Sequence, residues 1–202
     1  MVYVLTVDQR DSRRTADLVP ELLARLNASP RRPGLLRRFE RTAGDEVQGV
    51  FSAAGPAIDV VVELLRTDRW NIGVGAGPVL EPLPRSTRAG QGPAFVHARD
   101  AVTKAKSSPH HVNVEGSDAR QAEQVETVLW LLASVLRRRS QRGWEVADLL
   151  AAGMSRSEVG AKLGISQSAV TQRAQAAGIA EEVRGRALAT ELLSVADVGV
   201  PS

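Results

Sequence analysis

The sequence predicts an α+β domain followed by an all-helical C-terminal segment. Alternating β-branched runs and amphipathic helical stretches succeed one another over residues 1–116, and glycine and proline clusters separate them. After Gly116 only helical spacing remains. We therefore expect an α+β domain at 1–116, a connecting helix at 117–142 and a helical domain at 143–202.

The first elements follow from hydrophobic spacing. Alternation predicts a strand over 3–8, and leucines at helical spacing predict a helix over 16–26. After the breaker cluster at 29–34, strand-like runs at 35–42 and 46–51 flank the turn signal Ala43-Gly44-Asp45, which predicts a hairpin.

The remaining elements of this domain are predicted in the same way. They are a helix from Pro56 to Thr67, a glycine-rich strand over 71–79, a loop over 82–93, a helix over 94–106 and a short strand over 111–115. The order up to residue 79 is strand, helix, strand, strand, helix, strand.

The connecting helix has an apolar stripe that needs a partner. Val125, Leu129, Leu132 and Leu136 share one side of it, and the stripe could pack on its own domain or pair with a second copy of the chain. Further helices are expected over 144–152 and 180–195, and the last few residues should fray.

Composition excludes several kinds of chemistry. The chain has no cysteine, which excludes disulfides and thiolate catalysis, and its net charge of +3 with a pI near 9.9 suits contact with phosphates. The N-terminus lacks the basic region and cleavage site of a signal peptide, and no apolar run is long enough to cross a bilayer. We expect a cytoplasmic protein without a membrane partner.

The segment 153–178 contains two short helices with recognisable ends. Ser155 and Glu158 form a capping box, Gly164 supplies a tight turn, and Ser166 can cap the second helix. The run 159–171, VGAKLGISQSAVT, resembles bacterial helix-turn-helix regulators, with glycine at position 160 where alanine is commoner. That glycine should loosen the first helix by up to about 1 kcal/mol.

A helix-turn-helix would present its second helix to the DNA major groove. The candidate base-reading residues are Gln167, Ser168, Thr171 and Gln172, with Gln175 as a further candidate. The candidate phosphate contacts are Arg156, Lys162, Arg173 and the cluster Arg137, Arg138, Arg139 and Arg142. The alternative is a helical hairpin that packs on its own domain or binds protein, with the arginine run as a solvated helix end.

Residues 1–116 contain the motifs RTAGDEV at 41–47 and NIGVGAG at 71–77, followed by a predicted helix over 92–99. In this order and spacing they resemble the nucleotidyl cyclase superfamily, and more closely the SatD-type proteins. The resemblance implies a ferredoxin-like fold in which Asp8 and Asp45 hold Mg²⁺, and Arg41, Gly44 and Arg99 contact a nucleotide. From the residues alone, Asp8 and Asp45 could equally be a strand-end acid and a turn-forming residue.

Two departures from the cyclase pattern argue against catalysis. Phe95 stands where the resemblance places a catalytic asparagine, and Arg88 stands at the purine-selecting aspartate. Gly73, Gly75 and Gly77 are more simply explained by a bulge or by close packing than by phosphate binding. His97, His110 and His111 have no convincing metal spacing, and the adjacent pair would point to opposite faces of a strand.

The function predicted from the sequence is a dimeric, double-stranded-DNA-binding transcription regulator. Its cyclase-like domain would sense a ligand, such as a nucleotide with Mg²⁺, or mediate dimerisation, and no catalytic residue is assigned. Two alternatives are a metal-dependent enzyme of the cyclase class and an adaptor whose helix-turn-helix binds protein or RNA.

Overall fold

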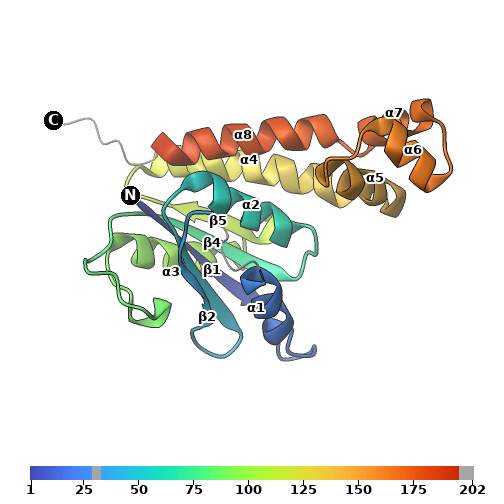
Figure 1. Cartoon of the computed structure of the whole chain (residues 1–202). Coiled ribbons are helices and arrows are strands. Elements are labelled where there is room, and N and C mark those ends of the chain that lie inside the picture. The colour runs from blue at the N-terminus through green and yellow to red at the C-terminus, as the bar shows by residue number, and fades with distance from the viewer. Residues whose placement is uncertain (29–32, 196–202) are drawn as a thin grey trace.

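The computed structural model describes residues 1–28 and 33–195, and it confirms a mixed α+β architecture (Figure 1). The strands are β1 (Val2–Gln9), β2 (Leu35–Arg41), β3 (Glu46–Phe51), β4 (Trp70–Gly77) and β5 (Val112–Glu115). The helices are α1 (Val19–Asn27), α2 (Ala54–Leu65), α3 (Pro93–Ala105), α4 (Ala119–Arg138), α5 (Gln141–Ala151), α6 (Arg156–Leu163), α7 (Gln167–Ala176) and α8 (Ile179–Val195). Two short 3-10 turns are η1 (Thr87–Ala89) and η2 (Pro109–His111).

The strands form one sheet in the order β2-β3-β1-β4-β5. Neighbouring strands are antiparallel except β4 and β5, which are parallel. The predicted hairpin is therefore β2 and β3, and β1 is a central strand between β3 and β4. This central position brings the end of β1 next to the β2–β3 turn, because Asp8 pairs in register with Glu46.

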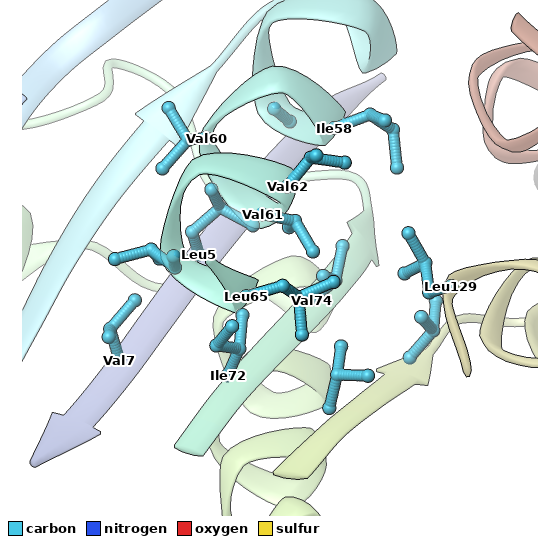
Figure 2. Close-up of a cluster of buried hydrophobic side chains, with 14 of the residues drawn as sticks. Leu5, Val7, Ile58, Val60, Val61, Val62, Leu65, Ile72, Val74 and Leu129 are labelled. Atoms are coloured by element: carbon cyan, nitrogen blue, oxygen red, sulfur yellow. The ribbon is translucent and has the colours of Figure 1, made fainter. Parts of the chain in front are cut away.

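The two faces of the sheet have different coverings. Alternate residues of β1, such as Leu5 and Val7, join Ile72 and Val74 of β4 in the main core, which α2 and α4 cover (Figure 2). On the opposite face, Val4 packs with residues of α3 in a smaller core. Asp8 lies on this second face, because it comes four positions after Val4 and side chains alternate between the two faces along a strand.

Glycines of β4 let α3 approach the sheet closely. A Cβ atom on Gly73 would lie 2.3 Å from the backbone nitrogen of Val102, and one on Gly75 would lie 2.3 Å from the carbonyl oxygen of Ala94. Both positions need glycine because the backbone of α3 occupies the space of a side chain. Of the two explanations that we weighed for these glycines, close packing is confirmed at Gly73 and Gly75.

The apolar stripe of α4 packs on the chain's own sheet. Val125, Leu129, Leu132 and Leu136 are buried in the main core, together with Leu193 of α8. The expectation of packing on its own domain is confirmed for this stripe. The α8 helix then runs beside α4 and contacts α2, as Figure 1 shows.

This return of α8 differs from the division expected from the sequence. Residues 143–202 were expected to follow the first domain as one unit, but α8 packs against α2 and α4. Helices α5, α6 and α7 are therefore inserted between two helices that belong to the sheet. We call residues 140–178 the helical insert and the remaining described residues the body.

Several predicted boundaries shift in the structure. The last strand begins at Val112, because His110 and His111 both adopt left-handed backbone conformations, with φ of 58° and 57°. They do not alternate across a strand as expected. The α5 helix begins at Gln141, where the Ser140 hydroxyl accepts a hydrogen bond from the Gly143 amide. The breaker residues 29–32 and the tail 196–202, where we expected fraying, lie outside the described residues.

None of the helices within 1–28 and 33–195 has the length and apolar character needed to span a membrane.

Candidate functional site

The helical insert is organised around a small core of its own. Val146 of α5, Val159 of α6, and Val170 and Ala174 of α7 are buried together. Leu163 and Ile165 pack against them at the turn between α6 and α7. The apolar positions expected to face inward in this segment therefore do so.

The ends of α6 and α7 are fixed by the predicted caps. The Ser155 hydroxyl accepts a hydrogen bond from the Glu158 amide, and the Glu158 carboxylate accepts one from the Ser155 amide, which completes the capping box. These hydrogen bonds lower the pKa of Glu158. Gly164 ends α6 in a left-handed conformation with φ of 65°, and the Ser166 hydroxyl caps α7.

Gly160 has a different role from the one expected. A Cβ atom at this position would lie 2.8 Å from the carbonyl oxygen of Ile165, and the Ile165 amide donates a 3.0 Å hydrogen bond to the Gly160 carbonyl. The missing side chain thus lets the turn fold back on α6. This packing role was not expected from the sequence, and the loosening of α6 by glycine stays a prediction.

The predicted DNA-contacting residues lie on α6 and α7 with differing exposure. Gln167, Ser168, Gln172 and Gln175 are exposed, whereas Thr171 is half-buried and donates its hydroxyl hydrogen to the Gln167 carbonyl. Arg156 and Lys162 are exposed and Arg173 is half-buried. Within the described part of the chain, these three cations make no ion pair, so their charge is available to an anionic partner.

The expected arginine cluster does not act as one phosphate-binding group. The side chain of Arg139 is only 1% exposed, its Nη2 lies 2.7 Å from the Glu182 carboxylate, and its Nε donates to the Ala177 carbonyl at the end of α7. Its guanidinium also lies 4.3 Å from the ring centroid of Trp144. The phosphate role predicted for Arg139 is wrong, because the residue joins α4, α5, α7 and α8.

The other members of the arginine cluster lie at the surface. Arg137 forms an ion pair with Asp68, while Arg138 and Arg142 are exposed. Only the last two remain free of an ion pair within the described residues.

Asp8 and Asp45 line one open pocket at the end of β1. The pocket has a volume of about 690 Å³, and Gly44 also lines it. The other lining residues are Gln9, Asp11, Ser12, Arg13, Arg14, Asn71 and Lys106. Strand order explains the convergence, because β1 lies beside β3 and the Gln9 amide donates to the Asp45 carbonyl.

The carboxylate of Asp8 is held by two donors. Asn71, its register partner on β4, donates to Oδ1 at 3.0 Å, and the Lys106 ammonium lies 3.3 Å from Oδ2. The Asp8 side chain is only 11% exposed, whereas that of Lys106 is 54% exposed. Asp8 thus has a cationic partner supplied by the chain itself.

The remaining residues of the cyclase-like pattern lie apart from this pocket. Arg41 pairs with Asp17 and donates to the Gly44 carbonyl, so it fastens the β2–β3 turn. Arg99 lines a second cavity of about 380 Å³ together with Arg88 and Phe95. Arg99 and the Asp8–Asp45 pair line separate cavities, with the hairpin turn contributing residues to both.

The residues of the first pocket do not fit the Mg²⁺ site that the resemblance implies. Mg²⁺ is usually held by one or two carboxylates together with phosphates and waters, so Asp8 and Asp45 would both have to offer their oxygens to it. Lys106 places a positive charge directly on Asp8. We therefore derive no chemistry through a bound metal.

Sequence reasoning missed two residues that complete the pocket at Asp8 and Asp45. Asn71 could have been found, because it is the polar residue at the start of a glycine-rich strand and lies opposite Asp8 once β4 is placed beside β1. Lys106 gives no such signal, because its position depends on where α3 ends over the sheet.

No family model, curated protein or solved structure matches the chain.

Proposed function

We propose that this protein is a DNA-binding transcription regulator in which the helical insert is a helix-turn-helix module. The observation that carries the proposal is the α6–turn–α7 unit, with its capping box, left-handed Gly164 and capped second helix. These features support the proposal because they fix the ends of two short helices joined by a tight turn, while one side of the second helix stays exposed.

The surface of α7 suits base recognition in the major groove. Gln167, Ser168 and Gln172 are exposed, and their amide and hydroxyl groups can hydrogen-bond base edges. Arg156, Lys162 and Arg173 supply positive charge around the same helix pair and would contact phosphates. Thr171 is a weaker candidate, because its hydroxyl is already bonded within α7.

The body would serve as the sensing or assembly part of the regulator. Its first four strands lie in the order β2-β3-β1-β4 with antiparallel neighbours, which supports a ferredoxin-like, cyclase-related fold. The pocket at Asp8 and Asp45 is the candidate ligand site. A homodimer would place two α7 helices on successive turns of an operator with inverted symmetry.

A gel-shift and footprinting experiment on the gene's own promoter region tests this function. We expect a protected inverted repeat, and affinity that falls steeply with salt because phosphate contacts release counterions. Arg173→Ala should weaken binding and reduce the slope of log affinity against log salt by about one.

Arg120→Ala is the matched control for this substitution. Arg120 is exposed in the first turn of α4. This first turn lies at the end of α4 that is away from the insert (Figure 1). The Arg120→Ala substitution should leave DNA affinity unchanged. Absence of specific binding at any salt concentration, or equal affinity for Arg173→Ala and the unaltered protein, would overturn the proposal.

A further inference from the structure

The Asp8 carboxylate has a polar and a cationic partner within the protein. The two oxygens of its carboxylate have separate donors, Asn71 on Oδ1 and Lys106 on Oδ2. An asparagine can turn its amide and offer an oxygen to a cation, but an ammonium group has no lone pair to offer. Of these two partners of Asp8, Lys106 is therefore the one that could not help to ligate a cation.

The position of Lys106 follows from the packing of α3. Gly73 and Gly75 bring the α3 backbone against β4, and α3 ends at Ala105 with Lys106 as its C-cap. The lysine then emerges beside Asn71 and Asp8, which lie on the same face of the sheet. The contact is thus built on backbone packing, although the lysine side chain itself is half exposed.

We propose that the Lys106 ammonium takes the place of a divalent cation at Asp8, so that the Asp8–Asp45 pocket binds no metal. A dication bound between Asp8 and Asp45 would share a pocket lined by three carboxylates, of Asp8, Asp11 and Asp45, and by three cations, of Lys106, Arg13 and Arg14. Repulsion from the cations offsets the attraction of the carboxylates for a dication, and the Lys106 ammonium already lies against Asp8.

The proposal predicts that removing the lysine charge creates a metal site. Mn²⁺ alone is a suitable probe, because it accepts carboxylate oxygens and its unpaired electrons broaden the NMR signals of nearby amides. In the full-length unaltered protein, titration with Mn²⁺ should produce no selective broadening around Asp8 and Asp45. In Lys106→Met, the same signals should broaden, with affinity for Mn²⁺ at least about tenfold higher.

Three variants make the outcome specific. Lys104 lies in α3 and pairs with Glu115 instead of Asp8. The Lys104→Met protein should therefore behave as the unaltered protein does. Lys106→Arg keeps the positive charge and should still exclude Mn²⁺. Adding Asp8→Asn to Lys106→Met should abolish the acquired binding.

Each contrary result would overturn the proposal. Selective broadening in the unaltered protein that Asp8→Asn removes would show that the pocket holds a metal despite Lys106. Failure of Lys106→Met to gain Mn²⁺, or a gain by Lys106→Arg, would show that the lysine charge is not what excludes it. The experiment contains no DNA, so its result is independent of the function proposed above.

Discussion

The body and the helical insert are stabilised in different ways. The body buries large side chains such as Phe51, Leu5 and Ile58 in one extended core, and it seats α3 against β4 by direct backbone contact. The insert buries four side chains, none larger than valine, in the core that its described residues form. Its helices depend on caps and on the contacts of Arg139.

The difference teaches where each part of the molecule is vulnerable. Burial of large apolar side chains contributes most of the stability of a domain, so the body should tolerate the loss of a single polar contact. Because its core is small, the insert gains little stabilising free energy from apolar burial. The insert should therefore open locally when one cap or one buried ion pair is removed, while the sheet remains folded.

The largest expected effect comes from filling the space between β4 and α3. In Gly75→Ala, the new methyl group would overlap the Ala94 carbonyl and the Ala98 amide, each 2.3 Å from its position. We expect a loss of about 3 kcal/mol or more in the free energy of unfolding, measured by urea denaturation.

Gly55→Ala is the control for this substitution. A Cβ atom at Gly55, in α2, would meet only the Thr190 methyl group at 3.5 Å, so alanine should be neutral or stabilising there. If Gly75→Ala were as stable as Gly55→Ala, the close seating of α3 on β4 would be wrong.

The second effect concerns Arg139, a buried residue that joins the insert to the body. Arg139→Met keeps much of the side-chain volume but removes the ion pair with Glu182 and the hydrogen bond to Ala177. We expect a cost of about 2–3 kcal/mol, because a buried polar pair loses one partner. Hydrogen exchange should accelerate in α5–α7 more than in β1 and β4.

Arg138→Met tests whether this cost depends on burial. Arg138 is exposed and has no ion pair within the described residues, so its loss should change stability by less than about 0.5 kcal/mol. Equal effects of the two substitutions would contradict the buried role of Arg139.

A smaller and more local effect is expected at the start of α6. Ser155→Ala removes the hydroxyl of the capping box and should cost about 1 kcal/mol, detected as faster hydrogen exchange in α6. Ser157→Ala, an exposed position inside the same helix, should cause no loss. Uniformly faster exchange throughout the sheet would show that the insert and the body unfold together.

The smallest expected effect concerns the pH dependence of stability caused by the Glu126 carboxylate in the body. Burial raises the pKa of Glu126, whose carboxylate accepts hydrogen bonds from Asn113 and the Val114 amide. The folded state therefore binds this proton more tightly than the unfolded state does, and stability falls as pH rises from about 4.5 through the raised pKa.

Glu126→Gln removes this dependence while keeping an oxygen acceptor. We expect the substituted protein to be more stable than the unaltered one at neutral pH, with the difference vanishing below about pH 4.5. Urea denaturation at a series of pH values measures it. A difference that grows towards low pH would contradict the direction of the shift.

Features that depend on neighbouring residues were predictable from the sequence. The strand and helix order, the β2–β3 hairpin and the capping box at Ser155 each follow from local patterns, and the structure contains them. The meeting of Asp8 and Asp45 was implied by the cyclase resemblance, and the pairing of β1 with β3 brings the end of the strand beside the turn.

Features that depend on distant packing were not predictable. The burial of Arg139 requires α8 to return along α4 so that Glu182 meets it, and nothing in the run of three arginines at 137–139 distinguishes this one. Gly160 looked like a weak helix residue, because its contact with Ile165 arises only after the turn closes. Lys106 reaches Asp8 only through the placement of a whole helix.

Because α4 and α8 lie side by side, residues 140–178 could be exchanged as one unit for another segment. The insert leaves the body at the end of α4 and re-enters it at Ile179, and both points lie at the same end of the helix pair (Figure 1). A short loop could join these two helices directly, as in an ordinary helical hairpin. The same body could thus carry a different module, or none, without any change to its sheet.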